Sequence, residues 1–361
     1  MKKTSCIYVT ARPSDAMIGR KDECHIKLFL DSLKKQTMAP DDFEVMIADC
    51  YYDKRPEQDH IRDNTYRGVK YPFTIYHWQV KSPWLKRGLW TYQASFNQGI
   101  MLSDAEMLCL FGDCCEPIPE YLERMWAWHK KGYFAMGLVI YKINNVLALK
   151  NQIAEGNFIK HNRDWDAHHV IRDSRWVFVE NAPDGVYTPI GFHSAQSFHG
   201  YASMPIEAAL KINGFDENMD GTRGVHDIDT GIRLMHAGYI EKVVLDKNIH
   251  IFENRHENVP KSVLSYEGPP IRSNYSLMML NNEAKRIRSN SQTLSDSDLD
   301  WMWNSHTTNE TRAKTYDYRQ NTHYQWWVKH QPIFDILDLR KKVQDNLKKG
   351  IVEIPEYYEV E

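Results

Sequence analysis

The chain has 361 residues, with 45 Lys and Arg against 48 Asp and Glu, so its formal net charge at pH 7 is −3. Hydrophobic residues make up 42% and charged residues 26%, which is the balance of a globular protein and not of a disordered one. No block of like charge indicates a polyanionic partner, and no apolar run approaches the roughly 18 residues of a membrane span.

The N-terminus and the cysteines favour a cytoplasmic protein. Lys2 and Lys3 precede only a short apolar stretch, and Arg12 and Asp15 follow it, so we expect a first β-strand and not a signal peptide. All cysteines fall in the first third of the chain and none forms a CxxC pair, which favours reduced thiols. They are Cys6, Cys24, Cys50, Cys109, Cys114 and Cys115.

Apolar runs and helical spacings alternate over the first part of the chain. In chain order they predict a strand, a helix, two strands, a helix, a strand and a helix at Cys6–Val9, Glu23–Gln36, Phe43–Ala48, Phe73–Tyr76, Thr91–Ile100, Met107–Phe111 and Glu120–Lys131. This succession predicts a parallel, doubly wound sheet with its ligand crevice at the carboxyl ends of the strands. Asp49 and Asp113 come at two such ends and are therefore candidates for the crevice.

The later sequence is less regular. Tyr133–Pro205 mixes aromatic residues with His and Asn, and we expect irregular structure there. Beyond it the pattern predicts two helices, two strands and a last helix at Ile206–Ile212, Asp227–His236, Val243–Leu245, Ile249–Phe252 and Phe334–Leu347. The composition changes near residue 265, which predicts one domain over residues 1–265 and a mainly helical extension over residues 266–361.

The polar C-terminal sequence contains tryptophans that have two explanations. An exposed tryptophan platform can bind an acceptor, whereas packing of helices onto the sheet domain explains the same residues. They are Trp301, Trp303, Trp326 and Trp327.

Several motifs of other enzyme classes are absent from the sequence. There is no GxxxxGK[ST], no GxGxxG after a strand, no HExxH and no GxSxG. Their absence argues against ATP hydrolysis, dinucleotide redox chemistry, zincin proteolysis and α/β-hydrolase chemistry.

Six short pieces of sequence follow one another in an informative order. They are Ser32–Thr37, Asp42–Asp49, Asn97–Ile100, Leu108–Asp113, Asn213–Glu217 and Gly224–Asp229. Each piece is weak alone, but together they resemble the family 2 glycosyltransferases of the GT-A fold. The resemblance covers about residues 4–260.

The resemblance implies a GT-A-type, Rossmann-like mixed sheet and an α/β fold class. It implies transfer of a sugar from a nucleoside-diphosphate sugar to an acceptor hydroxyl, assisted by Mn²⁺ or Mg²⁺ and usually with inversion. The acceptor stays open among a glycan, a lipid-linked sugar, a protein side chain and a modified nucleobase. Two alternatives are a nucleotidyltransferase on a similar sheet and a catalytically degenerate protein that only binds sugar nucleotides.

The family pattern assigns donor binding to residues near the strand ends. Asp49 matches the acid that holds the uracil or ribose, which favours a UDP-linked donor, although a strand-end Asp can also cap a turn. The first-strand loop matches the lining of the base, and two basic residues before the Asn97 helix can reach the diphosphate. The expected donor-binding residues are Ala11, Arg12, Asp49, Lys86, Arg87, Asn97 and Asp113.

The expected metal site departs from the family pattern. Hard divalent cations prefer carboxylate oxygens, and Asp113 at a strand end suits that role. The family's D-x-D has two aspartates, whereas this chain has Gly112-Asp113-Cys114-Cys115-Glu116. Glu116 can compensate for the second aspartate, and a nearby thiol favours a softer ion such as Mn²⁺. His256, which follows the last predicted strands, is the third expected ligand.

The catalytic base is expected at the start of the Asp227 helix. Asp227 matches the second residue of the family's "ED", while His226 replaces the glutamate. The acceptor hydroxyl loses its proton during attack, and a carboxylate is a suitable base. Asp229 is the alternative base, and both aspartates can also simply cap the helix. The residues expected near the donor sugar and the acceptor are His199, Gly200, Tyr201 and His226.

Overall fold

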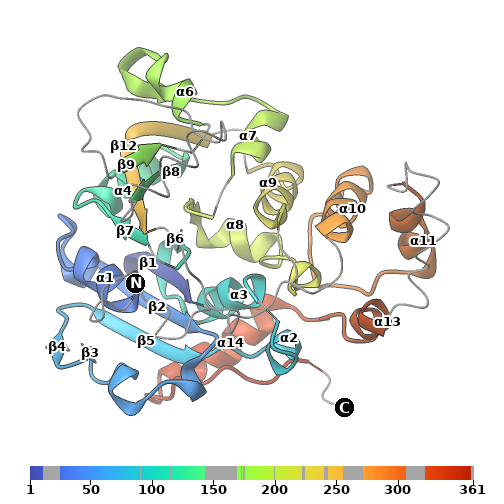
Figure 1. Cartoon of the computed structure of the whole chain (residues 1–361), viewed down its shortest axis with the longest axis horizontal. Helices are drawn as coiled ribbons and strands as arrows, with labels where there is room; N and C mark the ends of the chain where they lie inside the picture. Colours follow the sequence, from blue (N-terminus) through green and yellow to red (C-terminus); the bar gives the residue numbers. More distant parts are fainter. Residues whose placement is uncertain are drawn as a thin grey trace, which may run out of the picture.

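A computed structural model describes most of the chain. The described residues are 1–10, 25–89, 91–113, 115–142, 169–171, 173, 175–198, 200–221, 224–239, 243–254, 271–305 and 322–358. The central sheet has five strands in the order β11-β6-β1-β2-β5 (Figure 1). Its parallel strands are β1 (Lys2–Thr10), β2 (Phe43–Asp49), β5 (Thr74–Gln79) and β6 (Ala105–Phe111), and β11 (Ser203–Pro205) is antiparallel to β6. The predicted parallel sheet is therefore confirmed.

Alternation along the strands explains why both faces of this sheet are covered. In β1, Cys6 and Tyr8 belong to one core and Ile7 and Val9 to the other, and all four are fully buried. Helices α1 (His25–Leu33) and α4 (Tyr121–Lys130) cover the first face, and α3 (Gln93–Leu102) covers the second. Figure 1 shows α1 and α3 on opposite sides of β1.

A second sheet follows the first, in the order β10-β12-β8-β9, with β7 paired to β12. Its strands are β7 (Cys115–Pro117), β8 (Phe134–Lys142), β9 (His169–Ile171), β10 (Val186–Tyr187) and β12 (Val243–Asn254). The prediction of irregular structure over Tyr133–Pro205 was wrong at β8. The two strands predicted at Val243–Leu245 and Ile249–Phe252 are one strand with a register shift against β8.

The helices predicted at Ile206–Ile212, Asp227–His236 and Phe334–Leu347 are present. None of the described helices combines the length and apolar character needed to cross a bilayer. The remaining elements are the hairpin β3 (Thr65–Tyr66) and β4 (Val69–Lys70), with α2 (Pro83–Lys86), α6 (Trp176–Glu180), α7 (Phe192–Ser197), α8 (Ile206–Lys211), α9 (His226–His236), α10 (Ile271–Glu283), α11 (Asp296–Ser305), α13 (Thr322–Lys329) and α14 (Ile336–Leu347).

Helix α3 is buried along its whole length, so its terminal backbone groups need protein partners in place of water. At its amino end the Asp220 carboxylate accepts from Thr91 Oγ1 at 2.7 Å and from three successive backbone N–H groups at 2.7, 2.9 and 3.0 Å. At its carboxyl end, Gln344 Nε2 donates to the last two helical carbonyls at 3.0 and 2.9 Å, and Arg340 donates to the next carbonyl at 2.7 Å. Both ends are thus held by side chains from distant segments.

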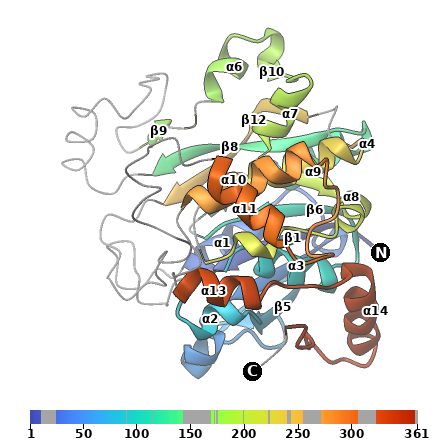
Figure 2. The ribbon, with the colours of Figure 1, turned by 90° about the vertical axis from the view of Figure 1, so that its right-hand side faces the viewer.

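The C-terminal helices share the core of the α3 face. Leu277, Trp327 and Ile336 are buried in the same cluster as Ile7 and Phe96. Figure 2 shows α10, α11 and α13 on the side that faces the viewer, and α14 apart from them at the lower right. The predicted boundary at residue 265 lies outside the described residues, and the division into two domains stays a prediction.

Packing explains two of the C-terminal tryptophans. The indole of Trp327 is buried and donates to the carbonyl of Asn218 at 2.9 Å. Trp326 packs against Trp84 and stacks on His330, with ring centroids 4.7 and 4.2 Å apart. These contacts favour the packing explanation over an acceptor platform at both positions.

Glu217 gives the fold a pH dependence that can be measured. Its buried carboxylate accepts from Asn97 at 2.7 Å and from Tyr357 at 3.1 Å. Burial, followed by the negative charge of Asp220, raises the pKa of Glu217 to about 8 from an ordinary 4.5. The folded protein therefore keeps a proton that the unfolded chain releases, and the associated stability is lost as pH rises from about 4.5 to about 8.

We predict that Glu217→Gln reduces this loss of stability. The free energy of unfolding of the variant, measured with urea at about pH 5 and about pH 8, should change less between the two conditions than that of the unmodified protein. Glu353→Gln, at an exposed position, is the control and should leave the difference unchanged. An equal pH dependence in Glu217→Gln and the unmodified protein would contradict the assignment.

Candidate functional site

Two tyrosines occupy the carboxyl edge of the central sheet. Tyr92 precedes α3, and Tyr201 precedes β11 and donates its hydroxyl to Glu253 Oε2 of β12 at 2.8 Å. Burial, and then the negative charges of Asp227 and Asp113, raise the pKa of Tyr92 well above its ordinary value, and Glu253 acts in the same direction. The charges of carboxylates from three separate segments therefore act on the Tyr92 hydroxyl.

Glycines let the tyrosine hydroxyls approach the backbone closely. A Cβ atom at Gly200 would lie 2.7 Å from the Tyr92 hydroxyl oxygen, a distance that no real side chain tolerates without a shift. A Cβ at Gly112 would lie 3.3 Å from the hydroxyl of Tyr201. Gly112 directly precedes Asp113, so this contact fixes the end of β6 from which the aspartate projects.

The backbone of Tyr201 is held from the opposite side. Its carbonyl accepts from the hydroxyl of Tyr121 at 3.1 Å and from the N–H of Gly137 at 2.7 Å. Tyr201 is therefore attached through its carbonyl to α4 and β8 and through its hydroxyl to β12, and its contact with a sugar stays a prediction.

Four other expected residues lie outside the described part of the chain, namely Ala11, Arg12, His199 and His256.

The start of α9 brings His226 and Asp227 to the same place. The His226 ring meets the Tyr92 ring edge-on, with centroids 4.8 Å apart. Asp227 Oδ1 accepts from the N–H of Ile228 at 3.0 Å. Asp229 instead lies in the interior, where it pairs with Arg233 at 2.8 Å. The geometry therefore favours Asp227 over Asp229 as a group that meets a ligand.

Arg175 supplies positive charge beside these acids. Its guanidinium is buried and donates to Asp173 at 2.6 Å and to the carbonyl of Gly137 at 3.0 Å. Burial lowers the pKa of Arg175, but the charges of Asp173 and then Asp227 outweigh it and raise the pKa. Arg175 therefore lies within electrostatic reach of Asp227.

Asp49 lies at the carboxyl end of β2 and is fully buried. Its carboxylate accepts from Arg55, from the N–H of Tyr51 at 2.8 Å and from His77 Nε2 at 2.9 Å. The Nδ1 atom of His77 accepts from the N–H of Ile61 at 3.2 Å, so Nε2 carries the hydrogen and donates to Asp49. Burial raises the pKa of Asp49, but His77 and Arg55 outweigh burial and lower it.

This network shows what Asp49 does within the fold. The carboxylate connects β2 to the 3₁₀ segment Tyr52–Lys54, to Arg55 and to β5. Its contact with a donor nucleoside stays a prediction.

The residues Asn97, Gln98 and Gly99 contact three different parts of the fold. Asn97 donates to Glu217 at 2.7 Å and accepts from the N–H of Phe215 at 2.7 Å. Gln98 accepts from the indole of Trp78 at 3.1 Å. A Cβ at Gly99 would lie 2.5 Å from Ile7 of β1. Two of the family-like pieces are thus joined by direct hydrogen bonds, and donor binding by Asn97 stays a prediction.

Lys86 and Arg87 are exposed at the end of α2. The guanidinium of Arg87 lies over the ring of Trp326, 4.6 Å from its centroid. The structure thus places Arg87 against α13, and contact of either residue with the diphosphate stays a prediction.

The expected metal ligands lie on neighbouring elements. Asp113 follows β6, and Glu116 lies in β7, opposite Phe252 of β12. Among the described residues, no three His, Cys, Asp or Glu side chains form a group that could hold a metal. One or two carboxylates are nevertheless what Mg²⁺ takes from a protein when phosphate oxygens complete its coordination. Binding of a divalent ion by Asp113 and Glu116 together with a diphosphate stays a prediction.

Three residues of this site were missed by sequence reasoning, namely Tyr92, Arg175 and Glu253. Glu253 directly follows a predicted strand, which was the available signal. Tyr92 and Arg175 have no local signal, because their positions depend on the approach of Gly200 and Gly137 from other segments.

No protein-family model matches the sequence, and no curated protein matches it. The structure is similar to that of S. aureus TarS 1-349 in complex with UDP-GlcNAc, with a TM-score of 0.50, 10% sequence identity and 99% of each chain covered. The complex of the same fragment with UDP gives a TM-score of 0.49 at 11% identity, covering 99% of this chain and 98% of that one.

A longer TarS structure is matched over 86% of this chain, with a TM-score of 0.46 and 11% identity, but the chain spans only 44% of its length. At about 10% identity, the likeness to the UDP-GlcNAc complex establishes a similar fold.

We predict that Asp49→Asn destabilises the protein by about 3 kcal/mol or more, because removing one partner of a buried ion pair leaves Arg55 uncompensated. The new amide has one acceptor oxygen in place of two, so it cannot accept from His77 at one position and from the N–H of Tyr51 at the other, and Ile61 fixes the His77 tautomer. Urea unfolding measures the change. Asp53→Asn, at an exposed position of the same segment, should change stability by less than about 0.5 kcal/mol. Equal stabilities of the two variants would refute the network's structural role.

Proposed function

We propose that the protein is a glycosyltransferase that moves a sugar from a UDP-sugar to an acceptor hydroxyl. The observation that carries the proposal is the group of carboxylates around Tyr92: Asp113 after β6, Asp227 on α9 and Glu253 on β12. Asp113 follows a parallel strand at the carboxyl edge of the sheet, where open α/β sheets bind their ligands, and the charges of the other two carboxylates act on the same tyrosine. The similar fold of TarS, solved in complex with UDP-GlcNAc, favours a UDP-sugar donor.

Asp227 is the proposed base. In a single displacement, the acceptor oxygen forms a bond to the anomeric carbon while the bond from that carbon to the diphosphate oxygen breaks. The acceptor's proton passes to the Asp227 carboxylate, and UDP leaves with the bonding electrons. Such a displacement inverts the anomeric centre. Arg175 brings positive charge within electrostatic reach of Asp227, and the ring of the neighbouring His226 packs edge-on against Tyr92.

The negative charge of the crevice is a reason for a divalent cation to bind with the donor. Asp113, Asp227 and Glu253 are all acidic, and a diphosphate brought among them meets repulsion. Asp113, with Glu116 nearby, is proposed to hold Mn²⁺ or Mg²⁺ together with phosphate oxygens. A bound ion neutralises charge on the leaving diphosphate.

The acceptor is proposed to be a hydroxyl-bearing glycan, lipid-linked sugar, protein side chain or modified nucleobase. The described part of the crevice does not favour one of these over the others.

We predict that UDP or a UDP-sugar stabilises the protein more than GDP- or CMP-linked compounds, and more with Mn²⁺ than without it. A ligand at a hundredfold excess over Kd stabilises a fold by about 2.7 kcal/mol, which a thermal-shift panel detects. Asp113→Ala should abolish the Mn²⁺-dependent part, because it removes the carboxylate at the end of β6.

The matched control for that variant is Asp104→Ala. Asp104 is exposed and precedes β6 at the opposite end of the strand, so its loss should leave the Mn²⁺ response intact. An unchanged response in Asp113→Ala would assign that residue to turn capping. A larger shift with a GDP- or CMP-linked sugar would refute the UDP assignment.

We predict that Asp227→Asn lowers transfer, or slow hydrolysis of the sugar nucleotide, by about 10²–10⁴-fold, because the proton acceptor is lost. UDP affinity and stability should change little, since asparagine has the size and capping ability of aspartate. Asp296→Asn, in the first turn of α11 and exposed, is the control for a helix-start change.

Asp229→Asn should instead destabilise the protein, because it breaks the buried pair with Arg233. Near-normal transfer by Asp227→Asn would exclude it as the base. Binding of UDP-sugars by the unmodified protein without transfer or hydrolysis would assign the crevice to sugar-nucleotide binding alone.

A further inference from the structure

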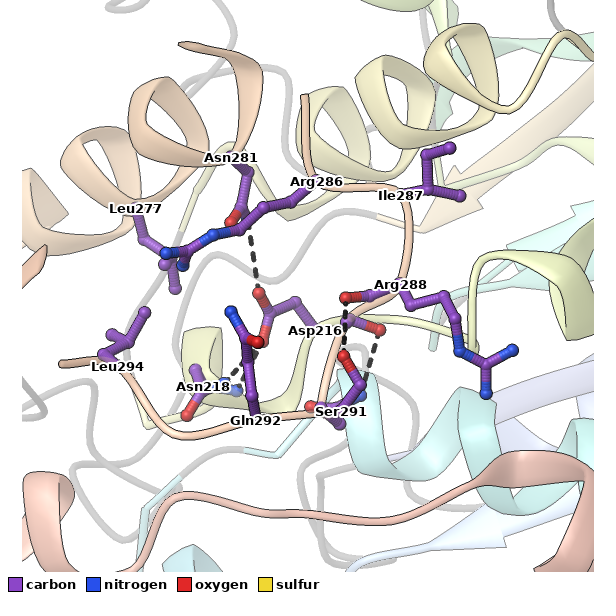
Figure 3. Close-up of a pocket in the computed structure, with 12 residues that line it drawn as sticks. Asp216, Asn218, Leu277, Asn281, Arg286, Ile287, Arg288, Ser291, Gln292 and Leu294 are labelled. Carbon is purple, nitrogen blue, oxygen red and sulfur yellow. Dashed lines mark hydrogen bonds between the residues drawn. The ribbon is translucent and has the colours of Figure 1, made fainter. Parts of the chain in front are cut away.

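A second cavity lies away from the carboxylate crevice, between α10 and the segment of residues 286–294. Its volume is about 210 Å³, which is below the roughly 300–1,000 Å³ of pockets for drug-sized ligands. Figure 3 shows Leu277 and Asn281 of α10 on one side and Asn218, Gln292 and Leu294 on the other. The cavity is therefore sized for one small unit.

The polar lining of this cavity offers hydrogen-bond acceptors. Asp216 Oδ1 accepts from the N–H and the Nδ2 of Asn218 at 3.1 and 2.9 Å. Asp216 Oδ2 accepts only a long hydrogen bond, 3.3 Å from Asn281 Nδ2, among the hydrogen bonds of the described residues. Both Asp216 and Asn218 are buried, with exposed fractions of 4% and 5%.

Asn218 carries a polar atom that needs a partner. Its Nδ2 faces Asp216, because the reverse orientation would bring two oxygens together. Its Oδ1 is buried and accepts no hydrogen bond from any residue that the structure describes. Such an orphaned acceptor costs about 1–3 kcal/mol. Gln292, which is exposed, lies beside Asn218 at the edge of the cavity (Figure 3).

The charges around the cavity are balanced. Arg286 pairs with Asp298 at 2.8 Å, and Arg288 pairs with Asp335 at 2.6 Å. Because both arginines already have carboxylate partners and Asp216 adds a negative charge, the lining does not favour an anion. Apolar contact comes from Leu277, Ile287 and Leu294.

We propose that this cavity is a binding site for a neutral, hydroxyl-rich ligand, such as one unit of a sugar chain. Hydroxyl groups donate to Asp216 Oδ2 and, as Gln292 moves aside, to Asn218 Oδ1. The C–H face of the ring packs on the aliphatic side chains. The site goes beyond the proposed transfer reaction, and it does not depend on that reaction taking place.

The test uses the full chain with glucose, N-acetylglucosamine and inorganic phosphate as probes, in saturation-transfer NMR with and without saturating UDP and Mn²⁺. At least one sugar should bind in both conditions, and phosphate should not compete with it. Ser291→Trp, at an exposed lining position, should fill the cavity and weaken sugar binding at least tenfold. Thr293→Trp introduces the same side chain at an exposed position outside the lining and should leave binding unchanged.

A second variant keeps the test independent of the tryptophan. Asn218→Ala should weaken sugar binding about three- to tenfold, the loss of one hydrogen bond. The proposal is overturned if no sugar binds, if UDP displaces the sugar, if phosphate competes, or if Ser291→Trp binds as well as Thr293→Trp. A failure of UDP to bind is a different result, because it would count against the proposed transferase. In that case the comparison of Ser291→Trp with Thr293→Trp still decides whether the cavity binds sugar.

Discussion

The burial of α3 is the constraint on which the other parts of the structure depend. A helix without solvent on any side must satisfy the N–H groups of its first turn and the carbonyls of its last turn within the protein. Asp220 supplies the acceptors at one end, and Gln344 and Arg340 supply the donors at the other. The loop before α9 and the C-terminal helix α14 are therefore required by the same helix. Burial raises the pKa of Asp220 to about 6, although its hydrogen bonds lower it. Burying this carboxylate therefore costs free energy, and the fold nevertheless uses it to cap α3.

The position of α3 also determines the crevice. Tyr92 lies at the N-cap position of the helix, where its hydroxyl packs against Gly200 and feels the charges of Asp113 and Asp227. A shift of the helix would move this tyrosine away from the end of β6. The capping contacts of α3 and the geometry of the carboxylates are thus two consequences of the same packing.

Local sequence patterns were sufficient for the elements of the central sheet. Runs such as Met107–Phe111 are buried on both faces, so their apolar character is continuous and easily seen. β8 was missed because Gly137 interrupts its apolar run. The structure requires that glycine, since a Cβ there would lie 2.4 Å from the hydroxyl of Tyr121. This requirement comes from a tertiary contact, and no window of local sequence contains it.

The candidate site was predictable only where a residue directly follows a strand or begins a helix. Asp113 and Asp227 satisfy that condition, and the structure brings both near Tyr92. Glu253 follows a predicted strand and could have been found by the same signal, whereas Arg175 acts through a long-range contact with Gly137, so its role depends on the assembled fold.

The family-like pieces divide into two groups once their contacts are known. Asn97, Asp229 and Asp49 are fully buried, and each is bound to another side chain that the structure describes: Glu217, Arg233 and Arg55. Removing such a buried polar group leaves its partner unsatisfied, so these positions are constrained by stability whatever the chemistry. Asp113 and Asp227 are only partly buried, at the edge where the chain segments converge. Because the fold itself constrains the first group, the pieces together indicate the architecture more strongly than the reaction, and the case for transfer depends on the second group.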